Sequence, residues 1–344
     1  MSSLMVGVVL AIIAGIINGS FAAPIKYAKI WKWENIWAVW AIFGMVVFPW
    51  VAVLITIPHP LDVYQQGGMQ NTMMLVAFGV GFGLAQILFG LGIAAVGMAL
   101  NFAIAIGIST AFGSLLPLLL QHRDKIFTDQ GHMIFLGVGL IVIGIVGCAM
   151  AGKMKDTHLG ADTRPRESAA VHMSFKAGLV IVVLAGIGSP LINFGLAFGD
   201  RLKEVAGMQG VPPGSQANVI WAPLNSAAFI PYILYCIYLW KKNNTASLYK
   251  APGTGRNWVF GAIMGGLWFG STVIYGVITA RLGNMGPILG WPLFMSAIII
   301  TSNVWGLATG EWKGSGSKAL NSMFASIFFL ILGFAALAYA GSLG

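Results

Sequence analysis

The sequence predicts an all-α polytopic membrane protein of about ten transmembrane helices, arranged as two inverted five-helix repeats. Three observations predict this fold class: an apolar composition, a series of long apolar stretches, and basic residues concentrated on one side of them. Of the 344 residues, 58% are hydrophobic and only 8% are charged, with a mean hydropathy of +0.84. A soluble domain carries about a quarter charged residues, so this composition indicates a chain surrounded by lipid.

Each apolar stretch is long enough to cross the hydrocarbon core of a bilayer, which takes about 20 residues. The first five predicted spans lie near residues 4–23, 36–57, 73–95, 98–120 and 132–151. The other five lie near residues 174–198, 217–240, 257–279, 286–308 and 319–341. The third and fourth spans are the least clearly divided, because only Val96, Gly97 and Met98 separate them.

The longest polar break divides the chain into two halves of five spans each. It predicts an N-terminal five-helix repeat over residues 1–151, a cytoplasmic linker over 152–173 and a C-terminal five-helix repeat over 174–344. Because five is an odd number, the two halves must enter the membrane in opposite directions, as inverted repeats do.

The two halves also resemble each other in sequence. Phe89–Gly97 matches Tyr275–Gly283 without a gap, and both segments lie at the junction of the third and fourth spans of their half. Asn18–Ala22 resembles Asn193–Ala197 more weakly, in the first span of each half. Similar halves inserted in opposite directions can exchange conformations and open one central site to either side in turn. The sequence therefore predicts alternating access.

The basic residues test the span count, because Lys and Arg concentrate in cytoplasmic loops. The enriched face carries fourteen of the nineteen: Lys26, Lys29, Lys32, Lys153, Lys155, Arg164, Arg166, Lys176, Lys241, Lys242, Lys250, Arg256, Lys313 and Lys318. The opposite face carries the other five: Arg123, Lys125, Arg201, Lys203 and Arg281. The enriched face is expected to be cytoplasmic, with both termini on the non-cytoplasmic side. The net charge of +9 thus reflects membrane orientation and does not indicate a nucleic-acid partner.

Ionisable side chains are missing from the middle of every predicted span, where one would cost about 2.5–3.5 kcal/mol or more. All ten acidic residues and all five histidines fall in loops or at span ends. A carrier of organic cations or anions needs a buried opposite charge, so the sequence favours an uncharged cargo. It also lacks a nucleophile–base pair or metal-ligand cluster at depth, which excludes an enzyme and predicts no catalytic residue, metal or cofactor.

Neutral polar and aromatic side chains occupy the spans instead. Amides offer donors and an acceptor to hydroxyl groups, and aromatic rings suit the apolar face of a sugar ring. The substrate-binding candidates are Asn18, Gln86, Asn101, Asn193, Asn225, Trp268, Tyr275 and Trp291, within a wider set of such residues that includes Ser109, Trp221 and Thr272. The alternative for each is a structural hydrogen bond to a neighbouring helix or, for tryptophan, an interfacial anchor. Gln86, Asn193 and Trp268 lie deepest in their spans and favour the ligand interpretation.

Several motifs resemble the L-rhamnose/proton symporter family of the drug/metabolite transporter superfamily. The most specific is Ala23–Lys26 leading into Trp31–Trp37, and Phe48–Trp50, Ala103–Ile108 and Gly310–Lys313 are also similar. The resemblance extends over nearly the whole chain. It implies two inverted five-helix halves, and uptake of a small neutral sugar, an L-rhamnose-like deoxyhexose, across the bacterial inner (plasma) membrane with protons as the coupling ion.

The resemblance also requires a protonatable group on the pathway. The proton-coupling candidates are Glu34, Asp62, Asp200 and Glu311, each of which has the alternative of a solvated loop charge. The chain carries Gln86 and Phe89 where the family pattern has Asn and Tyr. Uniport or symport of another neutral metabolite, such as a nucleoside or polyol, therefore remains an alternative, and the sequence allows a monomer or a homodimer.

Overall fold

The computed structural model describes residues 2–160 and 174–343, and every regular element among them is helical. Ten helical segments of this part of the chain are long and apolar enough to cross a membrane, which confirms the predicted span count. These segments are Ser3–Tyr27, Trp33–Thr56, Met69–Val96, Met98–Gln121, Asp129–His158, Phe175–Phe198, Pro213–Asn243, Gly255–Arg281, Gly283–Ala308 and Ser317–Ala340.

The helices of the first half run from the N-terminus to the end of α7. They are α1 (Ser3–Ser20), η1 (Ala23–Tyr27), α2 (Trp33–Ala41), the π-helical η2 (Ile42–Val47), α3 (Phe48–Thr56), α4 (Pro60–Gly67), α5 (Met69–Val96), α6 (Met98–Gln121), η3 (Arg123–Lys125) and α7 (Asp129–His158). Since α7 continues to His158, it extends past Gly152, where the linker was predicted to begin. The remainder of that linker, residues 161–173, lies outside the described residues.

The helices of the second half begin after the linker. They are α8 (Phe175–Gly188), α9 (Leu191–Phe198), α10 (Asp200–Met208), α11 (Pro213–Gln216), α12 (Asn218–Asn243), η4 (Ala246–Lys250), α13 (Gly255–Arg281), η5 (Gly283–Met285), α14 (Gly286–Ala308) and α15 (Ser317–Ala340). The order of spans, five before the linker and five after it, fits inverted repeats.

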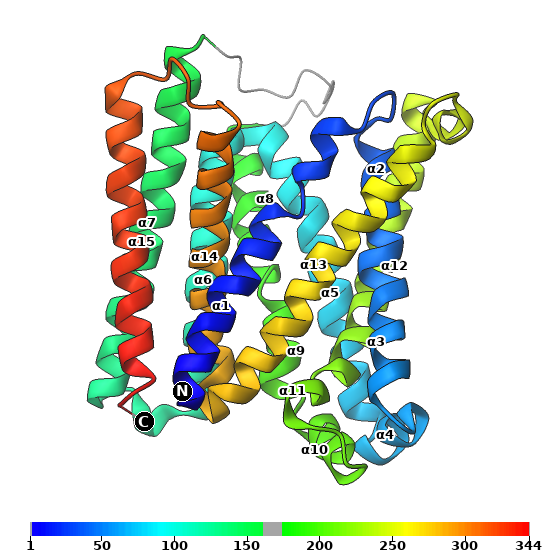
Figure 1. Ribbon diagram of the computed structural model, residues 1–344, viewed down its shortest axis with the longest axis vertical. Helices are drawn as coiled ribbons and strands as arrows, with labels where there is room; N and C mark the ends of the chain where they lie inside the picture. The colour runs from blue at the N-terminus through cyan, green and yellow to red at the C-terminus, as the bar shows by residue number, and fades with distance from the viewer. Residues whose placement is uncertain (1, 161–173, 344) are drawn as a thin grey trace.

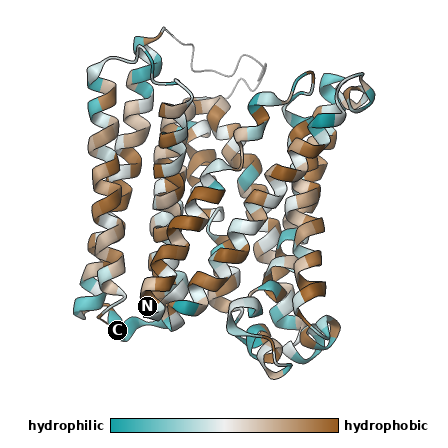
Figure 2. Ribbon diagram, viewed as in Figure 1, coloured by the Kyte–Doolittle hydropathy of each residue, from teal (hydrophilic) through white to brown (hydrophobic). Residues whose placement is uncertain are grey.

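The two termini lie at the same end of the bundle, together with the short helices α4, α10 and α11 (Figure 1). We call this end the terminal side, and the opposite end, where α7 ends and α8 begins, the linker side. Helices α7 and α15 form a pair at one edge of the bundle (Figure 1). Hydrophobic residues cover the middle of the long helices and hydrophilic residues gather at both ends (Figure 2), as expected for a bundle that crosses a bilayer.

Glycines allow the central helices to pack backbone against backbone. On α5, Gly79 and Gly83 lie against the carbonyl oxygens of Leu224 and Ala228 on α12, and a Cβ at either glycine would collide with them. Without a hydrophobic driving force in lipid, close packing of this kind is the main attraction between helices.

The span formed by α8 and α9 is broken near mid-depth. Pro190, which follows Ser189 at the break, has no backbone N–H and cannot continue the helical hydrogen-bond ladder. The Ser189 hydroxyl donates to the carbonyl oxygen of Ala185 at 2.7 Å and closes the last turn of α8. The chain re-enters a helix at Leu191, which places Asn193 on the first turn after the break.

Leucine at Gly79 or Gly83 should lower the thermal stability of the detergent-solubilised protein, because the side chain would force α5 away from α12. Overpacking of this kind costs about 1–3 kcal/mol. Gly90→Leu is the matched control on the same helix, since nothing lies within 4 Å of a Cβ at that position. Melting curves followed by size-exclusion chromatography measure the effect. Equal melting temperatures for all three variants would contradict this packing.

Candidate functional site

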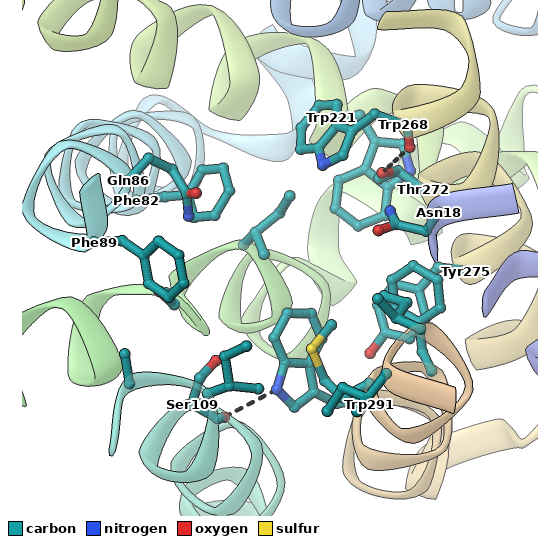
Figure 3. Close-up of a pocket in the computed structure, with 18 residues that line it drawn as sticks. Asn18, Phe82, Gln86, Phe89, Ser109, Trp221, Trp268, Thr272, Tyr275 and Trp291 are labelled. Carbon is teal, nitrogen blue, oxygen red and sulfur yellow. Dashed lines mark hydrogen bonds between the residues drawn. The ribbon is translucent and has the colours of Figure 1, made fainter. Parts of the chain in front are cut away.

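A cavity of about 200 Å³ lies near the middle of the bundle, between helices of both halves. Its polar lining groups come from Asn18 on α1, Gln86 on α5, Ser109 on α6, Ser189 at the α8–α9 break, and Thr272 and Tyr275 on α13. Figure 3 shows these helices arranged around the cavity, with the labelled amides and indoles around it. Neither half alone forms the site.

Aromatic rings cover much of the cavity wall. Trp221, Trp268 and Trp291 line it, with Phe82 and Phe89 on α5 opposite them (Figure 3). The indole of Trp291 is fixed because its Nε1–H donates to the carbonyl oxygen of Ser109 at 3.0 Å. The indole N–H of Trp221 is fully buried and has no partner among the described residues. It is therefore a donor still available to a ligand.

The cavity is electrically neutral, since no Asp, Glu, Lys, Arg or His is among the described residues that line it. The Gln86 side chain forms no hydrogen bond within the described part of the chain, so its amide can bond to a ligand. The Asn18 amide donates to the hydroxyl of Ser271 at 2.7 Å, and its oxygen is free to accept. The arrangement offers neutral donors and acceptors beside aromatic faces.

The structure brings five of the eight substrate-binding candidates to this cavity. They are Asn18, Gln86, Trp268, Tyr275 and Trp291. Asn101 and Asn225 are fully buried elsewhere, and the polar atoms of both side chains have no partner in the described residues. Sequence analysis did not single out Ser189 or Phe82. The Ser-Pro pair inside an apolar stretch is a signal that could have found Ser189, because proline frees backbone groups in a span.

The remaining candidate, Asn193, lies below the cavity on the terminal side and joins three other helices. Its amide donates to the carbonyl oxygens of Gly113 on α6, at 2.9 Å, and Pro287 on α14, at 3.2 Å. Its side-chain oxygen accepts from the hydroxyl of Tyr275 on α13. All of its hydrogen-bonding groups are thus used inside the protein, and the residue connects both halves.

The terminal side of the cavity is tightly packed around this contact. Every residue from Met285 to Phe294 is buried, and the Ser114 hydroxyl donates to the carbonyl oxygen of Ile288 at 2.7 Å. On the linker side α14 is more accessible, because from Ile298 to Ala308 only Gly306 is buried. Ile298 and Ile299, which line the cavity, belong to this accessible part. The cavity is therefore closed toward the terminal side.

None of the four proton-coupling candidates lines the cavity. Asp62 on α4 and Asp200 on α10 are exposed at the terminal side, and Asp200 is paired with Lys203 at 2.6 Å. Glu311, in the α14–α15 loop on the linker side, pairs with Lys26 after η1 has begun. The hydrogen bond from Lys26 holds the pKa of Glu311 below its usual value, although partial burial opposes the shift.

Glu34 differs from the other three because it is only 3% exposed. It lies on the first turn of α2 at the linker side. Its carboxylate accepts hydrogen bonds from the Thr245 hydroxyl at 2.6 Å and the Asn243 amide at 3.0 Å. The connection between α12 and η4 in the second half thus holds the start of α2 in the first half.

A ten-span bundle with a neutral cavity between its two halves has the architecture of a secondary transporter. The comparison with known proteins defines the class further. The family model for the L-rhamnose-proton symport protein (RhaT) matches residues 1–341, and the chain belongs to this family.

Two relatives illustrate the similarity. The L-rhamnose-proton symporter of Salmonella typhi is 27% identical over 305 residues, which cover 87% of this chain and 87% of the relative. The L-rhamnose-proton symporter of Yersinia pestis (strain Pestoides F) is 25% identical over 339 residues, which cover 96% of each chain. The similarity therefore extends across both halves.

Asn193→Ala should destabilise the protein, because it leaves the Tyr275 hydroxyl and a buried amide site without partners. We expect a loss of about 1–3 kcal/mol, the usual cost of unpaired buried polar groups, seen as a lower melting temperature in detergent. Asn225→Leu is the matched control, since it removes amide atoms that have no partner; its melting temperature should not fall. A larger loss in the Asn225 variant than in the Asn193 variant would refute this assignment.

Proposed function

We propose that this protein imports a neutral monosaccharide of the L-rhamnose type across the bacterial inner membrane, coupled to protons. The observation that carries the proposal is the neutral cavity, which combines an unpaired Gln86 amide, the free indole N–H of Trp221 and several aromatic faces. Such groups bind hydroxyls and the apolar face of a sugar ring. The names of the relatives support the substrate and the coupling ion.

The size of the cavity favours a monosaccharide. Sites for drug-sized ligands usually measure about 300–1,000 Å³, whereas this cavity measures about 200 Å³. The wall near Phe89, Ile106 and Ile298 is apolar and suits the methyl group of a deoxyhexose, while the amides of Gln86 and Asn18 face the hydroxyl groups. A nucleoside would need more space.

For the coupling site we favour Glu34 among the four candidates. Its carboxylate is buried and is held by side chains of the other half, so a movement between the halves changes its surroundings and its affinity for a proton. Asp62, Asp200 and Glu311 stay in contact with solvent, and movement changes their environment less.

The linker side is proposed to face the cytoplasm, because it carries the larger share of the basic residues. In vesicles of native orientation, an impermeant thiol reagent should label Glu204→Cys on α10 and fail to label Lys313→Cys until the membrane is opened. Both substitutions belong in a background without Cys148 and Cys236, and both positions are exposed. The reverse labelling pattern would invert the proposed orientation.

Purified protein in liposomes should accumulate labelled L-rhamnose when an inward proton gradient is imposed. Gln86→Ala and Trp268→Ala should reduce uptake at least about tenfold, since each removes a contact worth about 1–2 kcal/mol to a bound sugar. Asn225→Leu is the control, because Asn225 does not line the cavity. Normal uptake in both cavity variants would show that the sugar binds elsewhere.

The same assay tests the coupling site. Glu34→Gln keeps a hydrogen-bonding side chain but cannot release a proton, so it should still exchange labelled for unlabelled sugar while losing its response to the gradient. Glu311→Gln should keep that response. If Glu34→Gln responds to the gradient like the unaltered protein, the proton uses another group.

A further inference from the structure

The contact that closes the terminal side has a counterpart within the sequence. The similarity between the halves pairs Asn193 with Asn18, a separation of 193 − 18 = 175 residues, and Tyr275 with Phe89, a separation of 275 − 89 = 186. The backbone supports the second pairing, because Gly97 and Gly283, also 186 residues apart, both adopt a positive φ at the junction of the third and fourth spans.

The partners of Asn193 can be carried across the same repeat. Asn193 bonds to the backbone of Gly113 and Pro287. Moving by 186 residues pairs Gly113 with Ile299 and Pro287 with Asn101. When inverted repeats exchange conformations, each takes the contacts that the other made. In the exchanged conformation, Asn18 would therefore meet Ile299 on α14 and Asn101 on α6.

In the conformation described here, those residues have not met. Asn18 donates to Ser271 on α13 and lines the cavity, as does Ile299. Asn101 is 0% exposed, and neither its amide nitrogen nor its oxygen has a partner among the described residues. Its oxygen packs directly against Gly92 on α5. Buried amides without partners are rare because they cost free energy, so the position needs an explanation.

We propose that Asn101 is the partner of Asn18 in the conformation that closes the linker side. Asn18 then releases Ser271, and its side chain bonds to α6, as Asn193 now bonds to α14. The side chain of Asn101 compensates for a difference between the halves. Tyr275 supplies a hydroxyl to Asn193, whereas its counterpart Phe89 has none, and the amide of Asn101 supplies the missing group to Asn18.

This assignment rests on the proposed function only through alternating access, since it does not depend on which solute is carried. Asn101 thereby becomes a positioning residue for transport that does not line the cavity. The protein exchanges one set of hydrogen bonds for another: the contacts of Asn193 close the terminal side, and the contact between Asn18 and Asn101 closes the linker side. Neither set is needed to bind the solute.

Paired cysteines test the geometry directly, in membranes and in a background without Cys148 and Cys236. Asn18→Cys with Asn101→Cys should form a disulfide under mild oxidation, detected by mass spectrometry of the joined peptides. Asn193→Cys with Pro287→Cys is the positive control, because those residues already touch. Asn193→Cys with Asn101→Cys, on opposite sides of the cavity, should not react. If the positive control links and the Asn18–Asn101 pair does not, the proposal is wrong, whatever the solute proves to be.

A second variant separates a role in transport from a role in packing. Asn101→Leu should fold normally and bind the solute unchanged, because the present conformation gives its amide no partner. Its uptake rate should fall roughly fivefold, the change in population expected from losing one hydrogen bond in one of two conformations. Uptake equal to that of the unaltered protein would overturn the proposal. A lower melting temperature with unchanged uptake would assign Asn101 to packing.

Discussion

A polar group inside a bilayer has no water to bond to, so it must bond to the protein or to a ligand. Asn193 shows how this constraint shapes the bundle. The break at Pro190 places its amide where it bonds to α6, α13 and α14 together, and these bonds close one side of the cavity. Gln86 and the indole of Trp221 are left without protein partners beside the same space. The polar groups that are satisfied form the closure, and those that are not form the binding surface.

The two halves are similar in sequence but hold different conformations. In the second half, α9 bonds to α13 and α14 of its own half through Asn193. In the first half, Asn18 bonds to α13 of the other half through Ser271. This asymmetry is what a protein built for two exchangeable states requires, since one closure must open as the other forms. The neutral interior permits the exchange without moving a charge through the hydrocarbon core.

The fold could be predicted from the sequence because the bilayer imposes strong and simple rules. Length, hydropathy and the positions of Lys and Arg determine span number, and the structure has the predicted ten. The site was harder to predict, because nothing in the sequence shows which way an amide faces. Asn18 and Gln86 reach the cavity, whereas Asn101 and Asn225 look alike in sequence and are packed between helices. Ser189 reaches the cavity only because Pro190 breaks the helix beside it.

The central claim is that one neutral cavity, open toward the linker side in this conformation, holds the solute. Ser109 lines that cavity and is close in size to cysteine, so Ser109→Cys in a background without other cysteines reports on it directly. The rate at which a thiol reagent labels this cysteine from the linker side should fall when L-rhamnose is added, and a charged sugar acid should give no protection. Labelling at the same rate with and without L-rhamnose would contradict the claim.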